Sequence, residues 1–214
     1  MDKKENNLLI KKSNKIYNMA VKKHGMSSGA VLLDDQQTQY FRFNEIIKFI
    51  DVNNTDKTVL DIGCGNAELY KFLNFSGFRG KYTGYDINNK LVMQAKKKYK
   101  NIDVQKKDIL TQKIAEKFDY VIMSGLFNAN VNQSIDWIHT FISTMFSLCN
   151  KVLIFNAISD YVNYKDKKMV YLSPEDILSY CIKNLSARVT LVHHNLRYNF
   201  TVVVYKDNSW KSIN

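Results

Sequence analysis

The sequence of 214 residues predicts an α/β fold in which helices cover both faces of a mostly parallel sheet. Three observations support this. Short apolar runs alternate with stretches of helical periodicity from residue 58 onward, as in strand–helix–strand units with right-handed crossovers. The first run leads into the turn Asp61-Ile62-Gly63-Cys64-Gly65. The chain then closes with two alternating segments that predict an antiparallel hairpin.

The first 55 residues predict an N-terminal helical arm or lid. Residues 1–15 are rich in Lys and Asn and predict a frayed or weakly helical segment. A short helix is expected over 16–21, stopped at His24-Gly25, with a flexible joint over 26–29. Residues 36–50 predict a helix that packs on the sheet, because apolar side chains share one face: Tyr40, Phe43, Ile46, Ile47 and Ile50.

Residues 56–206 predict a single domain, followed by a tail over 207–214. Strands are expected over 58–61, 81–86, 102–105, 118–123 and 151–155, and helices over 68–74, 88–99, 135–149 and 174–185. The last helix has a typical start in Ser173-Pro174-Glu175-Asp176: a capping Ser, Pro in the first position and acids in the first turn. The hairpin strands are expected over 187–194 and 198–206.

The composition limits the partners of the chain. The net charge is +11, but 27 of the 31 basic residues are Lys and four are Arg. Specific nucleic-acid recognition relies on the planar Arg fork, and abundant Lys and Asn are equally typical of an AT-biased coding sequence. A nucleic-acid partner is therefore an open alternative that we do not favour.

The cysteines and the apolar runs indicate a cytoplasmic protein. Cys64, Cys149 and Cys181 have no metal-ligand spacing, so we expect buried reduced thiols and no metal site. No apolar run is long enough to cross a bilayer, and Leu8-Leu9-Ile10 is too short for a signal-peptide core. We expect no membrane partner, and the sequence does not predict the oligomeric state.

The glycine turn and a later carboxylate predict a nucleoside site. Glycines at 63 and 65 allow a ligand to approach the main chain closely. Asp86 ends the second expected strand 23 positions after Gly63, which is about the spacing at which a carboxylate meets ribose hydroxyls. A dehydrogenase is disfavoured, because the turn reads Asp-Ile-Gly-Cys-Gly and the sheet is expected to end in a hairpin.

These residues resemble the class I S-adenosylmethionine-dependent methyltransferases over roughly residues 56–206, with Ala67 in place of the third family glycine. The resemblance implies a three-layer Rossmann-like sandwich with a seven-stranded sheet. It also implies S-adenosyl-L-methionine as cofactor and S-adenosyl-L-homocysteine as product, with main-chain amides of the turn and Asp86 forming the cradle. The implied cofactor-binding residues are Asp61, Gly63, Cys64, Gly65, Asp86, Ile87, Asp108, Ile109, Ser124, Gly125 and Arg42.

The acceptor side is less defined by the sequence. Ligands lie beyond the carboxyl ends of parallel strands, so we expect Phe127, Asn128 and Asn156 to face the acceptor. No general base stands out; His24 and Tyr40 from the arm are further catalytic candidates. The Asn/Asp-Pro-Pro-aromatic motif of amino-methylating DNA and RNA enzymes is absent, which counts against a base-N-methylating enzyme.

A small-molecule methyltransferase is the function we expect from the sequence. The compact single domain, the lack of an added recognition module and aromatic residues near the expected mouth of the pocket favour it: Tyr17, Tyr40, Phe127, Tyr161 and Tyr164. An RNA or protein methyltransferase is the alternative. A non-catalytic cofactor-binding protein of the same fold is disfavoured by the intact glycine turn and acids.

Overall fold

A computed structural model describes residues 3–25, 29, 36–194 and 196–207. The expected joint over 26–28, position 195 of the hairpin turn and the tail over 208–214 lie outside the described residues. The strands are β1 (Thr58–Ile62), β2 (Lys81–Asp86), β3 (Asp103–Lys106), β4 (Phe118–Ser124), β5 (Cys149–Ile158), β6 (Val189–Val192) and β7 (Asn199–Tyr205). The helices are α1 (Lys3–His24), α2 (Gln36–Ile47), α3 (Glu68–Phe75), α4 (Asn89–Lys98), α5 (Ile135–Ser147) and α6 (Pro174–Asn184).

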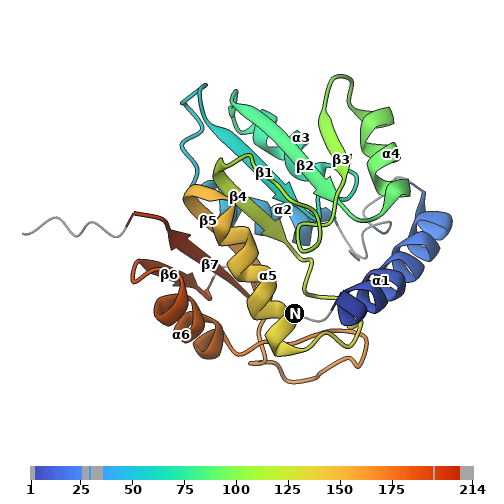
Figure 1. The fold of residues 1–214 in the computed structure, drawn as a ribbon, viewed down its shortest axis with the longest axis vertical. Helices are drawn as coiled ribbons and strands as arrows, with labels where there is room; N and C mark the ends of the chain where they lie inside the picture. Colours follow the sequence, from blue (N-terminus) through green and yellow to red (C-terminus); the bar gives the residue numbers. More distant parts are fainter. Residues whose placement is uncertain (1–2, 26–28, 30–35, 195, 208–214) are drawn as a thin grey trace, which may run out of the picture.

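The strands form one seven-stranded sheet in the order β3-β2-β1-β4-β5-β7-β6 (Figure 1). The first five strands are mutually parallel, and β7 runs antiparallel to both β5 and β6. The predicted parallel sheet with a C-terminal antiparallel hairpin is therefore confirmed.

Alternation along the strands creates the three layers. Leu60 and Ile62 of β1 belong to a buried cluster that includes apolar side chains of α5 and α6. Val59, one position earlier, belongs to a second cluster with side chains of α2, α3 and α4. Since successive side chains of a strand point to opposite faces, each face of the sheet has its own helical cover, and the predicted three-layer sandwich is confirmed.

Local signals set the helix ends. The Ser173 hydroxyl accepts a hydrogen bond from the Asp176 N–H at 3.0 Å, as expected for the cap of α6. Ser134 caps α5 in the same way through the Trp137 N–H. The expected helix over 135–149 was too long, because α5 ends at Ser147 and Cys149 already begins β5.

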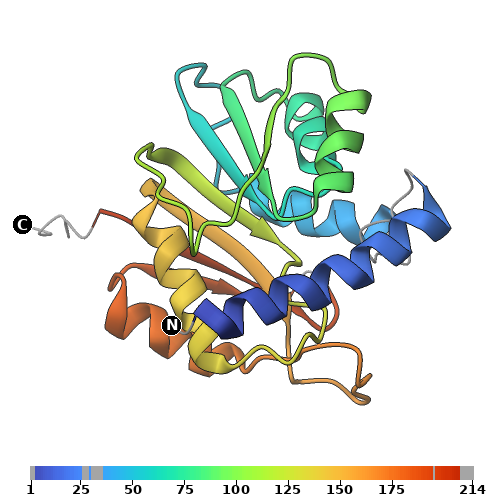
Figure 2. The same ribbon diagram turned by 45° about the vertical axis from the view of Figure 1, so that its right-hand side comes forward.

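The N-terminal segment differs most from the prediction. The expected frayed arm and short helix form one continuous 22-residue helix, α1. Tertiary contacts stabilise it, since Leu9 and Asn6 on its inner face are 4% and 1% exposed. Figures 1 and 2 show α1 lying across the edge of the sheet where β1, β2 and β4 end. None of the helices in the described part of the chain is long and apolar enough to cross a lipid bilayer.

Candidate active site

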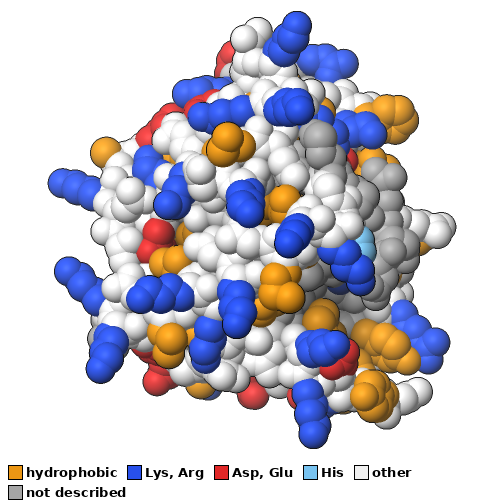
Figure 3. Space-filling model, turned by 90° about the vertical axis from the view of Figure 1, so that its right-hand side faces the viewer, with side chains coloured by type: hydrophobic (Ala, Val, Ile, Leu, Met, Phe, Trp, Pro, Cys, Tyr) orange, Lys and Arg blue, Asp and Glu red, His pale blue; other side chains and the backbone are white. Residues whose placement is uncertain are grey.

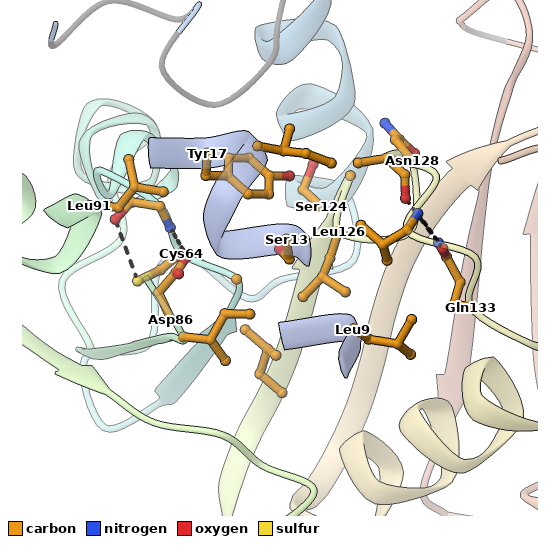
Figure 4. A pocket seen from close by; sticks show the side chains of 18 of the residues that line it. Leu9, Ser13, Tyr17, Cys64, Asp86, Leu91, Ser124, Leu126, Asn128 and Gln133 are labelled. Carbon is orange, nitrogen blue, oxygen red and sulfur yellow. Dashed lines mark hydrogen bonds between the residues drawn. The ribbon is translucent and has the colours of Figure 1, made fainter. Parts of the chain in front are cut away.

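A cavity of about 1000 Å³ lies between α1 and the carboxyl ends of the parallel strands. Its floor comes from the ends of β1, β2 and β4, and its sides include residues 128–133 and 166–169. Figure 4 shows side chains from α1, the glycine turn and the β4 end pointing into it. Its volume matches the upper end of ligand pockets, roughly 300–1,000 Å³. Within the described ranges, no three His, Cys, Asp or Glu side chains form a metal-ligand group.

The glycine turn has the left-handed backbone that the sequence predicted. Gly63 and Gly65 have φ values of +73° and +56°, and Ala67 adopts +63° despite its side chain. The resemblance implied that main-chain amides of the turn form part of the cradle, but the first two have partners within the protein. The N–H groups of Gly63 and Cys64 both donate to the Tyr85 carbonyl, at 2.8 and 3.1 Å. These bonds join the ends of β1 and β2. A ligand would therefore contact the surface of the turn and not these two N–H groups.

Asp86 holds the other side of the turn. One carboxylate oxygen accepts the Gly65 N–H at 2.8 Å, and the other accepts the Asn88 N–H at 2.7 Å. The side chain is 8% exposed and lines the cavity. Burial raises its pKa, although the backbone hydrogen bonds act in the opposite direction. A carboxylate has about four lone-pair sites, and the backbone hydrogen bonds from Gly65, Ile87 and Asn88 leave one for a ribose hydroxyl. Ile87 lines the cavity beside it.

Asp61 also lines the cavity, at the end of β1. It is 3% exposed, and its carboxylate accepts a hydrogen bond of 2.7 Å from the Tyr82 hydroxyl. Burial raises the pKa of Asp61 to about 7; the bond from Tyr82 lowers it, and the nearby Asp86 charge raises it further. A cationic group in the cavity would therefore meet a carboxyl group that titrates near neutral pH.

Asp108 and Ile109 line the cavity beyond β3. Asp108 accepts hydrogen bonds from the Leu110 N–H and the Thr111 hydroxyl, so it caps the following turn. It also accepts the Asn6 side-chain N–H at 2.9 Å, while the Asn6 oxygen accepts the Trp137 indole N–H at 3.1 Å. Asn6 was missed at the sequence level, because both partners lie more than 100 positions away.

Tyr17 of α1 covers the middle of the cavity (Figure 4). Burial raises the pKa of its phenol to about 12; the Asp86 charge also raises it, and Arg42 opposes both. The ring thus lies within electrostatic reach of both ends of the expected cofactor site. Together with the Asn6 contacts, it makes α1 the roof of the cavity.

The end of β4 places Ser124 and Gly125 on the cavity wall, as expected. The expectation that Asn156 faces the acceptor is wrong, because its side chain is fully buried and lies outside the cavity lining. Its oxygen accepts the Gly125 N–H at 2.9 Å, and its nitrogen donates to the Ser124 hydroxyl at 3.1 Å. Asn156 is therefore a positioning residue for the strand end.

Some of the predicted catalytic and binding residues line the cavity, and others pack in the core. His24, Arg42 and Asn128 line the cavity. Tyr40 does not; its ring packs 5.5 Å from that of Phe72, because the outer face of α2 is directed towards α3. That candidate is incorrect.

The aromatic side chains expected at the pocket mouth are placed elsewhere, except for Tyr17. Phe127 is 1% exposed, and its ring makes edge contacts with Trp137 and Phe141 in the core. Tyr161 and Tyr164 are 62% and 79% exposed and do not line the cavity. Of the five aromatic residues that favoured a small-molecule acceptor at the sequence level, Tyr17 is therefore the one that lines the cavity.

The family model of a methyltransferase domain matches residues 53–190. The chain belongs to the class I S-adenosylmethionine-dependent methyltransferase family, as its sheet order, glycine turn and strand-end acids already indicate.

Individual proteins show the same likeness. The chain is 27% identical over 165 residues to a protein of Mycobacterium tuberculosis (strain ATCC 25618 / H37Rv) named "Putative methyltransferase Rv1506c", covering 72% of this chain and 97% of that one. The structure resembles the N-methyltransferase NodS of Bradyrhizobium japonicum WM9 in complex with S-adenosyl-L-homocysteine, with a TM-score of 0.65, 15% identity and coverage of 88% and 97%. It also resembles magnesium protoporphyrin IX methyltransferase of Synechocystis PCC 6803 with bound SAM, with a TM-score of 0.60, 21% identity and coverage of 80% of each chain.

Proposed function

We propose that the protein transfers a methyl group from S-adenosyl-L-methionine to a small-molecule acceptor. The observation that most supports a small-molecule acceptor is that helix α1 forms a roof over the cavity. It bonds to Asp108 through Asn6, to the Val131 carbonyl through Lys12 and to Asn88 through Asn18. A cavity covered in this way favours an acceptor that enters it whole over a site displayed on a macromolecule.

The residues of the cavity fit the cofactor. The Asp86 carboxylate suits the ribose hydroxyls, the Asp61 carboxyl suits the ammonium group, and the Arg42 guanidinium suits the carboxylate. Arg42 is 8% exposed, and its Nε donates to the Asn199 side-chain oxygen at 3.1 Å. That bond holds the guanidinium beside Gly125 at the end of β4, where it can bind a ligand carboxylate.

The proposed reaction needs alignment more than acid–base chemistry. When bound, the cofactor supplies an electrophilic methyl group on a sulfonium. The protein holds the acceptor in line with it and excludes water beneath α1. Orientation of this kind can supply about 7–11 kcal/mol of the barrier reduction, so the reaction does not require a general base.

The proposal is tested by methyl transfer from isotopically labelled cofactor into fractionated cell extract. We expect label in the small-metabolite fraction, at a rate that depends on the added protein. Asp86→Ala, which removes the ribose ligand, serves as the inactive control. Label confined to the RNA or protein fraction would contradict a small-molecule acceptor.

A specific observation favours RNA as a second candidate acceptor. Helices α1 and α4 together carry eleven Lys and one Glu, which leaves 20 basic and 19 acidic residues in the rest of the chain. The two helices are neighbours, joined by the Asn18–Asn88 hydrogen bond. Figure 3 shows Lys and Arg spread over this face with few acidic side chains among them. Codon bias would scatter the lysines, whereas a polyanion-binding surface concentrates them.

A further inference from the structure

Arg42 and Asn128 approach the same point at the end of β4. Gly125 has a φ of +78°, and a Cβ added there would lie 3.2 Å from Arg42 Nη1 and 3.3 Å from Asn128 Nδ2. A side chain at this position would press on both neighbours, and the positive φ also favours glycine. The main-chain carbonyl of Asn128 accepts the Val170 N–H at 2.8 Å, which fixes the backbone of this residue. The proposed function assigns the cofactor's carboxylate to Arg42, so an acceptor held by Asn128 would lie beside that end of the cofactor.

Among the described residues, two buried amide oxygens of the cavity lining have no hydrogen-bond partner. Gln39 Oε1 and Asn128 Oδ1 are buried and unpaired within the described part of the chain. Both residues are 8% exposed and line the cavity. Gln39 lies three positions before Arg42 on α2, a spacing that places both on one helix face.

Such oxygens need an explanation, because buried polar atoms in folded proteins nearly always have partners. Elsewhere in the cavity lining, Glu68 Oε2 is also unpaired, but the same carboxylate pairs with Lys98 through its other oxygen. Among the described residues that line the cavity, Gln39 and Asn128 are thus the two with an unpaired amide oxygen. Two acceptors without donors indicate a ligand that brings N–H or O–H groups.

The chemistry of the two oxygens favours an uncharged amine. A hydroxyl group has one hydrogen and satisfies one oxygen, whereas a primary amine has two hydrogens. Carboxylates at the same place would stabilise the ammonium form, which has no lone pair to attack a methyl group. Amide oxygens accept hydrogen bonds without a net charge, and the adjacent Arg42 cation disfavours a second positive charge.

We propose that Gln39 and Asn128 form an amine-binding subsite and that the methyl acceptor is a primary amine. This inference rests on the proposed methyl transfer. The nitrogen lone pair forms a bond to the methyl carbon as the carbon–sulfur bond breaks and its electron pair stays on sulfur. The methylated nitrogen then releases a proton to water. The products are a secondary amine and S-adenosyl-L-homocysteine.

The first test identifies the methylated atom. The labelled small metabolite from cell extract is isolated after incubation with wild-type protein, and its methyl position is determined by mass spectrometry. Label on an amine nitrogen supports the inference. Label on oxygen, sulfur or carbon overturns it, whereas the absence of any labelled small metabolite contradicts the proposed function on which it rests.

The second test compares Gln39→Met and Asn128→Leu with Gln94→Met. Gln94 also has a buried unpaired oxygen, but it lies outside the cavity lining, so it is a matched control. We expect the first two variants to lose at least tenfold in kcat/KM for the labelled amine. Their affinity for S-adenosyl-L-homocysteine, measured by calorimetry, should stay within twofold of wild type, and Gln94→Met should retain both properties.

The outcomes separate this inference from the proposed function. A tenfold loss of S-adenosyl-L-homocysteine affinity in both variants would show that the oxygens hold the cofactor's own ammonium group, which overturns an acceptor subsite. Unchanged kcat/KM in both variants overturns it as well. Failure of the wild-type protein to bind S-adenosyl-L-homocysteine would instead contradict the proposed function.

Discussion

Asp61 shows how a single buried carboxyl couples the site to pH. Its pKa of about 7 in the folded protein lies above the ordinary value of 3.8. Between these values the folded state holds a proton that the unfolded chain releases. The contribution of Asp61 to the free energy of unfolding is therefore fully present below about pH 4 and is lost as the pH rises through about 7.

The prediction at this position concerns Asp61→Asn, which keeps an oxygen for the Tyr82 hydroxyl but cannot ionise. We expect the free energy of unfolding of wild type to fall with rising pH relative to the variant, by up to about 1.4 kcal/mol per pH unit between about pH 4 and 7. Urea unfolding across this range measures the difference. Parallel pH dependences for both proteins would contradict the raised pKa.

At the scale of elements, α1 determines whether the cavity is closed. Asn6 links it to two partners from different parts of the chain, Asp108 and Trp137. Removing its side chain leaves the Trp137 indole N–H without its partner, a loss of about 1–3 kcal/mol, and takes one of three donors from Asp108.

We therefore expect Asn6→Ala to loosen α1 without unfolding the sheet. Hydrogen exchange of α1 amides should accelerate, and S-adenosyl-L-homocysteine should dissociate faster. The exposed neighbour Asn7 provides the matched control, Asn7→Ala. Equal exchange rates for α1 in the two variants would mean that Asn6 does not hold the roof in place.

Elements were predictable where the signal is local. The strands of the parallel sheet, the hairpin and the capped start of α6 all follow from apolar periodicity and from turn or cap residues. The continuous helix α1 could not be predicted in this way, because the burial of Leu9 and Asn6 depends on partners far away in the sequence.

Within the site, too, local patterns were predictable and contacts between distant residues were not. The turn glycines and Asp86 were found from their spacing, but the use of the turn amides by the Tyr85 carbonyl was not visible. On α2 the sequence pointed to Tyr40 and Arg42, whereas the cavity is lined by Arg42 and by Gln39, which was not predicted. Residue spacing gives the period of a helix but not its rotation about its axis.

The whole molecule is electrically polarised, since nearly all of its net positive charge lies on α1 and α4. Exposed lysines attract phosphates as point charges, and their binding weakens as salt rises. The charge distribution predicts that an RNA oligomer binds this face with an affinity that falls steeply with salt.

The measurement is RNA binding by Lys11→Glu/Lys97→Glu against the control Lys165→Glu/Lys183→Glu, which has the same net charge. We expect the first pair to lose at least tenfold in affinity at low salt and the control to lose much less. Equal losses would assign the effect to net charge alone, and undetectable binding by wild type would eliminate the RNA candidate.

The account depends most on the claim that the turn after β1 and the Asp86 carboxylate hold a sulfonium nucleoside. Calorimetric titration of S-adenosyl-L-methionine into wild type and Asp86→Ala tests it most directly, with Asp103→Ala as a control carboxylate outside the cavity lining. We predict at least tenfold weaker binding for Asp86→Ala, about 1.4 kcal/mol, and no such loss for the control. Equal affinity in wild type and Asp86→Ala, or no binding to wild type, would contradict the claim.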